Sequence, residues 1–249
     1  MAGGQQYYLS YSFYWAIAAL AGFVFSLLLA WHLISPLNFF YAQFYGPVGI
    51  GENIVEYGPL NRNRSGFETT TREEHERLMS ELVQSINDGG KGLAEIDYLD
   101  RSGKPIARFL TAAEITHLED VAHLVNGFNV VGVVLGVLLL VMVIIARWRK
   151  LEPPKLSRLL RNMLALIVLI SLIVLVIGPV EVFYWLHEWI FPAKNQWFFY
   201  YEDSLMTTLL KAPVIFGPIA VAWLLIAFLC WLFLFFMVLR MNYAKNPVF

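Results

Sequence analysis

Residues that can move protons lie close together in the stretch EITHLEDVAHL, residues 114–124. His117 and Asp120 are three positions apart, which makes them neighbours on one face of a helix. A further histidine, His187, occurs much later, in the stretch HEWIFP. A histidine whose ring is held by a carboxylate can act as a general base near neutral pH. His117, Asp120 and His187 are therefore the candidate catalytic residues.

The stretch around His117 has the pattern of a helix start. Thr111 precedes Glu114 by three residues, which is the spacing of a capping box. An apolar stripe follows at helical intervals, made of Ile115, Leu118, Ala122 and Val125. A long apolar run begins a few residues later, so we expect this polar helix to continue into a membrane span and to hold His117 at the membrane rim.

The composition is that of a membrane protein. The chain has 249 residues, of which 58% are hydrophobic and 15% charged, and its mean hydropathy is +0.59. A net charge of −1 argues against a nucleic-acid partner, because phosphate binding needs clustered Lys and Arg. The single cysteine, Cys230, excludes an internal disulfide and a Cys-based zinc site. We expect no metal and no organic cofactor.

Four segments are long and apolar enough to cross a bilayer: residues 11–34, 126–148, 160–182 and 214–239. The first is preceded by no Lys or Arg and is longer than a signal-peptide core, so it is expected to be a retained anchor. The predicted class is an all-α membrane protein, a four-helix transmembrane bundle.

The orientation follows from residues 149–159, which form a short loop between the second and third spans. This loop and its borders are basic, with only Glu152 opposing the charge of Arg147, Arg149, Lys150, Lys155, Arg158 and Arg161. The positive-inside rule makes the loop cytoplasmic. Both termini are then cytoplasmic, and the segments 35–125 and 183–213 lie outside.

The outer segment 35–125 is expected to be a small extracytoplasmic α+β loop domain. Thr71 and Glu74 predict a helix through about Asn87, and Gly residues at 89 and 90 end it. The stretch EIDYLDRSGKPIARFL predicts a hairpin. We expect the domain to rest on the second outer loop and the membrane domain, and we expect His75, in an E/R-rich helix, to be solvated.

Standard enzyme signatures are absent. HEWIF begins like a zinc-protease motif but lacks its second histidine, and there is no GxSxG elbow or Gly-rich phosphate loop. The spans carry no chain of ionisable groups like that of an ion transporter. Glu181, which follows Gly178 and Pro179, is the exception. It is either a substrate-binding residue or an ordinary interfacial carboxylate.

Two stretches resemble the signatures of a family of four-span bacterial membrane proteins, the lipoprotein intramolecular transacylases. EITHLEDVAHL is similar to that family's Glu-x-x-His-Met-x-Asp-Val signature, with Leu118 in place of Met and Ala122 at a position that is often basic. HEWIFPAKNQWFFYYEDSLMTTLLKAP is similar to the second signature, in which a histidine is followed by aromatics, a Trp, an Asp-x-Leu segment and a Pro.

This resemblance implies a reaction, its partners and its place. Such transacylases move the sn-2 acyl chain of a diacylglyceryl-modified lipoprotein to the amine of its N-terminal cysteine, which gives the lyso-form lipoprotein. The partners would be these lipoproteins and membrane lipid, in the bacterial cytoplasmic (inner) membrane, with the site on the outer side. The family's two histidines would correspond to His117 and His187, and Trp197 and Asp203 would contact substrate.

Ester-to-amine transfer suits two histidines, because it needs a base for the amine and an acid for the leaving oxygen. Our interpretation makes His117 the base, oriented by Asp120, and His187 the acid, although the roles can be reversed. The two rings should then lie about 4–8 Å apart. Two alternatives stay open: a non-catalytic lipid- or protein-binding scaffold, and a metal-dependent membrane hydrolase with His117, Asp120 and His187 as ligands.

Overall fold

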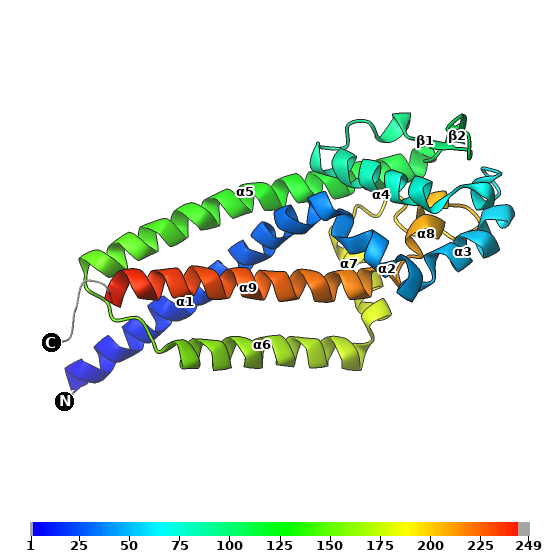
Figure 1. Cartoon of the computed structure of the whole chain (residues 1–249). Coiled ribbons are helices and arrows are strands. Elements are labelled where there is room, and N and C mark those ends of the chain that lie inside the picture. The colour runs from blue at the N-terminus through cyan, green and yellow to red at the C-terminus, as the bar shows by residue number, and fades with distance from the viewer. Residues whose placement is uncertain (1, 244–249) are drawn as a thin grey trace. The chain divides into compact units, whose positions relative to one another are not determined.

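The long helices of this chain are apolar along most of their length. The computed structural model describes residues 2–243, and the side chains of residues 13–241. The four long helices are α1 (Ala2–Ile34), α5 (Ala112–Trp148), α6 (Leu156–Ile177) and α9 (Phe216–Tyr243) (Figure 1). Each is long and apolar enough to cross a membrane, by length and composition. This confirms the four expected apolar helices of a multi-pass membrane protein.

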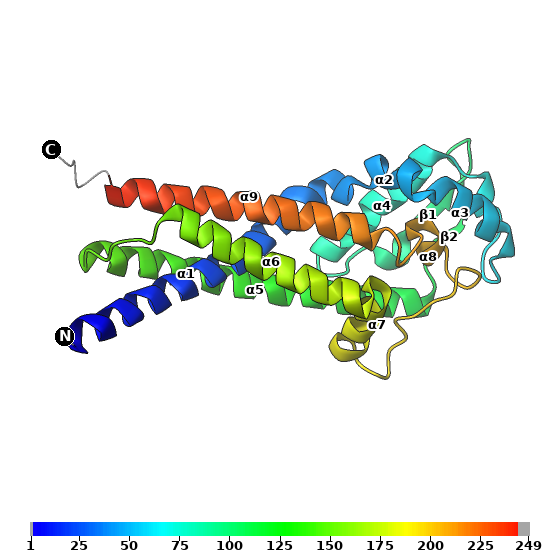
Figure 2. The same ribbon diagram turned by 90° about the horizontal axis from the view of Figure 1, so that it is seen from below.

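One helix end differs from expectation. The polar helix that carries His117 and the second apolar run form one uninterrupted helix, α5, as expected. The third apolar helix, α6, ends at Ile177 rather than at residue 182, and a separate short helix, α7 (Pro179–Ile190), follows (Figure 2). Gly178 has a φ of +105°, which favours glycine, and Pro179 is suited to a first helical position because its nitrogen has no hydrogen to donate.

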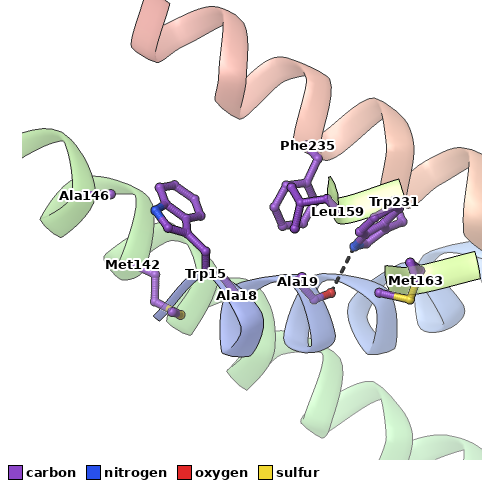
Figure 3. Packing of buried hydrophobic residues seen from close by; sticks show 9 residues of the cluster. All are labelled: Trp15, Ala18, Ala19, Met142, Ala146, Leu159, Met163, Trp231 and Phe235. Carbon is purple, nitrogen blue, oxygen red and sulfur yellow. Dashed lines mark hydrogen bonds between the residues drawn. The ribbon is translucent and has the colours of Figure 1, made fainter. Parts of the chain in front are cut away.

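The chain divides into two compact units. The first comprises Met1–His32, Asn129–Val176 and Trp223–Phe249, and the second comprises Leu33–Phe128 and Ile177–Ala222. The core of the first unit is formed by Trp15, Ala18, Ala19, Met142, Ala146, Leu159, Met163, Trp231 and Phe235 (Figure 3). Trp231 Nε1 donates a hydrogen bond to the carbonyl of Ala19 at 3.0 Å. Small residues at this contact let the helix backbones approach, and the indole N–H is satisfied without water.

The second unit contains the remaining, shorter elements. Its α-helices besides α7 are α2 (Tyr41–Val48), α3 (Ile50–Tyr57), α4 (Arg72–Asn87) and α8 (Leu205–Leu210). Short 3₁₀ turns occur at η1 (Ser35–Phe40), η2 (Gly58–Leu60), η3 (Phe67–Thr69) and η4 (Leu93–Glu95). Strands β1 (Asp97–Leu99) and β2 (Pro105–Arg108) pair antiparallel, with Tyr98 opposite Ala107, which confirms the hairpin. The described part of the unit is thus mostly helical, with one two-stranded sheet.

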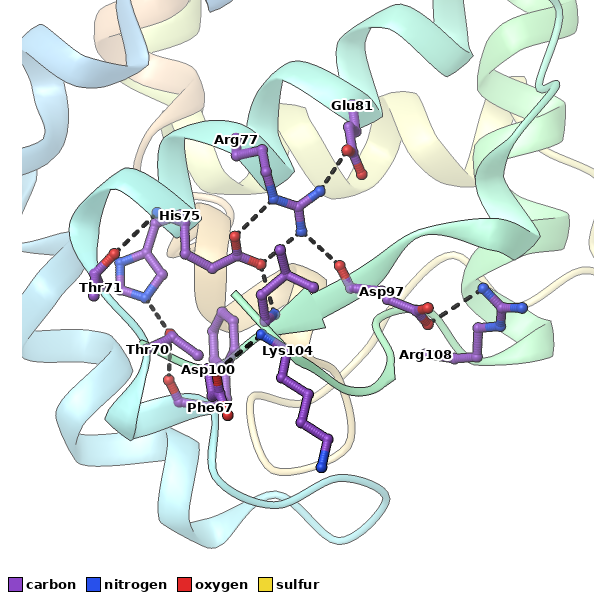
Figure 4. Close-up of polar contacts among 12 residues, drawn as sticks. Phe67, Thr70, Thr71, His75, Arg77, Glu81, Asp97, Asp100, Lys104 and Arg108 are labelled. Atoms are coloured by element: carbon purple, nitrogen blue, oxygen red, sulfur yellow. Dashed lines mark hydrogen bonds and ion pairs between the residues drawn. The ribbon is translucent and has the colours of Figure 1, made fainter. Parts of the chain in front are cut away.

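Helix α4 begins where the sequence predicts. Thr71 is its N-cap and accepts a hydrogen bond from the backbone N–H of Glu74. Arg77 joins α4 to the hairpin, because its guanidinium donates to a Glu74 carboxylate oxygen and to the carbonyl of Asp97, both at 2.6 Å (Figure 4). Leu99 N–H also donates to Glu74, at 2.8 Å. The carboxylate of Glu74 therefore stabilises both the helix and strand β1.

His75 is not solvated, contrary to expectation: its exposed fraction is 4%. It lies on the helix face of Leu78, Met79 and Leu82, which pack into the core of the second unit. The charged residues beside it in the sequence hid this periodicity. A buried face, rather than the local charge of the stretch, determines whether a helical residue meets water.

Both nitrogens of the His75 ring are hydrogen-bonded, one to Thr70 (Figure 4) and the other to Tyr45. Thr70 Oγ1 donates to the carbonyl of Phe67 at 2.6 Å, so it accepts a hydrogen from His75 Nε2 at 2.7 Å. Nδ1 of the neutral ring then accepts from the Tyr45 hydroxyl at 2.8 Å. Burial lowers the pKa of His75 to about 4. His75 is therefore a neutral residue of the core.

The two loops of the second unit contact each other directly, as expected. The Tyr41 hydroxyl donates to the carbonyl of Leu209 at 3.0 Å, and Asn53 Nδ2 donates to the carbonyl of Thr208 at 2.8 Å. Helices α3 and α8 lie side by side in both views of the chain (Figures 1 and 2). Residues on both sides of these contacts are buried, so the loops share one core rather than two weak ones.

Candidate functional site

Helix α5 begins with the capping box that the sequence predicts. The Thr111 N–H donates to Glu114 Oε2 at 2.6 Å, and the Glu114 N–H donates to Thr111 Oγ1 at 3.4 Å. Glu114 is fully buried, and its second oxygen, Oε1, accepts from the Ser204 hydroxyl at 2.5 Å. The start of α5 is therefore joined to the N-cap of α8, which is Ser204.

His117 lies one turn further along α5, with its side chain buried among aromatic rings. Its ring centre is 4.8 Å from that of Phe191 and 6.1 Å from that of Phe199. The ring of His187, from α7, lies 6.1 Å away, centre to centre. The expected approach of the two histidines is confirmed. Both rings belong to the second unit, although they come from segments far apart in the sequence.

The tautomer of His187 follows from its hydrogen bond. Nδ1 lies 2.8 Å from the carbonyl of Phe183, one helical turn earlier, and a carbonyl can only accept. Nδ1 therefore carries the hydrogen, and Nε2 of the neutral ring has a free lone pair. Burial lowers the pKa of His187, which the Phe183 carbonyl partly offsets. The neutral imidazole with a basic Nε2 is the favoured form.

Asp120 makes no hydrogen bond to His117 within the described part of the chain. The Nδ1 atom of His117 is buried and has no hydrogen-bond partner among the described residues. Oδ2 of Asp120 instead accepts a hydrogen bond from Asn195 Nδ2, at 2.6 Å. Three helical positions leave about 60° between two side chains, and the short Asp side chain reaches the neighbouring loop rather than the ring. The expected hydrogen bond between Asp120 and His117 is therefore wrong, and Asp120 contacts the second loop.

The three candidate substrate-binding residues, Glu181, Trp197 and Asp203, do not lie together. The ring of Trp197 lies 5.2 Å from that of His187, so Trp197 joins the histidine pair. Asp203 forms an ion pair with Arg62 at 3.1 Å. Glu181 is exposed in the first turn of α7. Of the three candidate substrate-binding residues, only Trp197 contacts either histidine.

Sequence reasoning missed several residues of the site. Asn195 and Ser204 bind the two carboxylates of α5, and Phe183 contacts His187 with ring centres 3.9 Å apart. Glu114 was identified only as a helix cap. The three-residue spacing between Glu114 and His117 could have identified Glu114 as a residue of the site, because it places Glu114 on the helix face that His117 and Asp120 share. No comparable signal marked Asn195 or Ser204.

The arrangement offers acid–base groups rather than a cluster of metal ligands. Nowhere in residues 2–243, as far as they are described, do three His, Cys, Asp or Glu side chains gather as they would around a metal ion. The structure brings together two imidazole rings. Nδ1 of His187 is hydrogen-bonded, which leaves the lone pair on its Nε2, and Nδ1 of His117 has no partner among the described residues. Such a pair can accept a proton at one ring and donate at the other.

A family model of known proteins matches most of this chain. The family model described as "Lipoprotein intramolecular transacylase Lit" matches residues 23–212, which include both histidines and the two carboxylates of α5. No curated protein and no solved structure matches the chain significantly. The family match covers most of the chain and contains the whole histidine site. This chain belongs to the lipoprotein intramolecular transacylase family.

Proposed function

We propose that this protein moves the sn-2 acyl chain of a diacylglyceryl-modified lipoprotein to the amine of the lipoprotein's N-terminal cysteine. The products are an N-acylated cysteine and a free sn-2 hydroxyl, the lyso form. The observation that carries the proposal is the pair of imidazoles, His117 and His187, whose rings lie 6.1 Å apart in a chain of this family. An ester and an amine can both reach such a pair at one time.

His187 is the base in this mechanism. An α-amine has a pKa of about 8, so a neutral imidazole can take its proton as the nitrogen attacks the ester carbonyl. The Phe183 carbonyl holds Nδ1–H, which leaves Nε2 to accept that proton. Burial lowers the pKa of His187 and keeps the ring in its basic form at neutral pH. The structure thus favours the reverse of the roles that sequence reasoning preferred.

His117 is the acid. Its ring hydrogen stabilises the oxyanion that forms on the ester carbonyl, or reaches the sn-2 oxygen as the carbon–oxygen bond breaks. One N–C bond forms and one C–O bond breaks. The imidazolium of His187 passes the amine proton to His117 as His117 gives its own proton to the sn-2 oxygen, so both rings end neutral and the reaction needs no co-reactant. General acid–base help of this kind contributes about 10²–10⁴ in rate.

The aromatic residues around the pair provide an apolar lining. Phe191 contacts both histidine rings, and Trp197 contacts His187. Acyl chains are apolar, and such a lining disfavours water, which would otherwise compete with the amine for the ester. We assign the substrate-binding role to Trp197, because its ring lies beside the base.

The site faces the extracytoplasmic side of the bacterial cytoplasmic membrane in this proposal. The supporting observation is the basic loop 149–159, which the positive-inside rule makes cytoplasmic, together with both termini. Four spans then place the loops with the histidines on the outer side. A membrane-impermeant thiol reagent added to intact cells should not label the variant Lys155→Cys, whereas it should label Glu119→Cys.

Mass spectrometry of N-terminal lipopeptides tests the reaction. Cells that express this protein should contain lipoproteins with an N-acylated cysteine and one fewer ester-linked chain than cells without it. An unchanged set of lipopeptides would contradict the proposal and would favour the non-catalytic scaffold.

A further inference from the structure

Glu114, His117 and Asp120 recur at three-residue spacing along the first turns of α5. Each of them contacts one segment of the second loop, residues 191–204. Glu114 binds Ser204, His117 contacts Phe191 and Phe199, and Asp120 binds Asn195. One helix face therefore carries an imidazole with a carboxylate one turn before it and another one turn after it.

The two carboxylates bind opposite ends of the stretch 195–204. Asn195 Nδ2 donates to Asp120 at 2.6 Å, and the Ser204 hydroxyl donates to Glu114 at 2.5 Å. Between these two anchors lie Trp197 and Phe199, whose rings contact His187 and His117 respectively. Hydrogen bonds to an ionised acceptor are roughly twice as strong as neutral ones, so these two contacts are suited to holding a loop.

We infer that Glu114 and Asp120 are positioning residues that fasten the stretch 195–204 over the histidine pair, and that neither carboxylate transfers a proton. This inference rests on the proposed function, since the histidine pair is what the stretch covers. Glu114 is fully buried with both oxygens occupied, by Thr111 and Ser204, so substrate cannot reach it. Asp120 is committed to Asn195 rather than to His117.

Exchanging the side chains of Asp120 and Asn195 tests whether Asp120 holds the loop or takes part in proton transfer. Asn195→Asp places two carboxylates against each other and should lower acyl transfer about a hundredfold, through repulsion and the loss of the donor. Asp120→Asn keeps a neutral hydrogen bond to Asn195 and should lose less than about fivefold. The double variant Asp120→Asn/Asn195→Asp restores a charged hydrogen bond with donor and acceptor exchanged. It should recover to within about fivefold of the wild type.

Trypsin provides a readout that does not depend on acyl transfer. Lys194 is exposed and directly precedes Asn195, so cleavage after Lys194 should accelerate when the anchor is broken. The full-length purified protein in detergent is digested, and the fragment ending at Lys194 is followed by mass spectrometry. Cleavage should be fast in Asn195→Asp and slow again in the double variant.

Two further variants keep the test sharp. Asn195→Ala removes the donor without repulsion and serves if Asn195→Asp fails to fold; it should lose about tenfold in transfer and be cleaved faster. Gln196→Ala is the matched control, because this neighbouring side chain is exposed and, among the described residues, donates only to the carbonyl of Phe198 within the same loop. It should change neither readout.

The possible outcomes separate the two ideas. A double variant that is protected from trypsin but as inactive as His187→Gln would overturn the inference, because the carboxylate of Asp120 would then act in the chemistry. Unchanged cleavage and activity in both Asn195 variants would overturn it as well. A last outcome is that the wild-type protein transfers no acyl chain while cleavage after Lys194 is still fast in Asn195→Asp and slow in the double variant. In that case the proposed function fails and the fastening role of Asp120 stands.

Discussion

His75 and the His117–His187 pair are both buried among aromatic rings, yet their ring nitrogens are used in opposite ways. Both nitrogens of His75 have fixed partners, the hydroxyls of Tyr45 and Thr70. In the pair, Nδ1 of His117 is buried without a partner, and His187 is hydrogen-bonded through Nδ1 alone, as far as the described residues show. Burial and aromatic contact therefore do not distinguish the proposed catalytic histidines from a core histidine, whereas the hydrogen-bond partners of their ring nitrogens do.

The pKa shifts support the same conclusion. Burial lowers the pKa of His75 and also that of His187, so both rings are neutral near pH 7. Perturbed pKa values occur in structural residues as well as in catalytic ones. What separates the two places is that the proton of His75 is committed to Thr70, while His187 keeps a free lone pair at Nε2. Four predictions test this comparison, in order of decreasing effect.

The largest effect is expected for the pair. His117→Gln and His187→Gln should each lower acyl transfer by about 10²–10⁴, because each removes one acid–base group at nearly constant side-chain volume. The double variant should be hardly worse than either single one, since the two groups act as a unit. The lyso-form lipopeptides are quantified by mass spectrometry in cells that express each variant.

His123→Gln is the control for these substitutions. His123 lies on the same helix but is exposed, so its replacement should leave transfer unchanged. Lyso-form lipoprotein at wild-type levels in both single variants of the pair would contradict the proposed catalysis, and the scaffold reading would then hold.

The second effect is the pH dependence of stability that His75 contributes. Its pKa falls from about 6.5 in the unfolded chain to about 4 in the folded one, so the unfolded state binds more protons between these values. The contribution is fully present above pH 6.5 and is lost as the pH falls toward 4, on the order of 3 kcal/mol. Melting temperatures between pH 4 and pH 7 should therefore fall more steeply for the wild type than for His75→Gln. Parallel curves would show that His75 is not held neutral.

Much of the fold was predictable because its signals are local. The four apolar helices, the capping box at Thr111 and Glu114, helix α4 and the hairpin all follow from spacing within a short stretch. The break at Gly178 was missed because the apolar composition continues across it, although the Gly-Pro pair marked it. The burial of His75 was missed because the charge of its neighbours was given more weight than the periodicity of Leu78 and Met79.

The site was predictable only in part, for a related reason. The approach of His117 and His187 followed from the family resemblance and from the position of both at the ends of apolar helices. The partners of Asp120 and Glu114 could not be read from the sequence, because the hydrogen bonds to Asn195 and Ser204 join segments that no periodic pattern links. Spacing on a helix tells which side chains share a face and does not tell what lies opposite them.

The third effect concerns stability without activity. His75→Ala leaves the hydroxyls of Tyr45 and Thr70 without their partner and opens space in the core, so it should cost about 2 kcal/mol of the free energy of unfolding. The acyl transfer of the folded protein should be unchanged at pH 7. Denaturation midpoints and lipopeptide yields per folded molecule, measured on the same preparation, separate the two quantities. Loss of transfer in a fully folded variant would remove the distinction between His75 and the pair.

The smallest effect comes from one aromatic neighbour of each site. Phe191→Leu keeps an apolar side chain beside His117 but removes an edge-on ring contact at 4.8 Å, which is worth about 0.5–1.5 kcal/mol. If the ring positions His117 for catalysis, transfer should fall by roughly 2–12-fold. Phe67→Leu is the matched change beside His75, with ring centres 5.4 Å apart, and it should lower only the melting temperature. Equal losses of transfer in both variants would mean that the aromatic lining acts through general stability, because Phe67 contacts neither histidine of the pair.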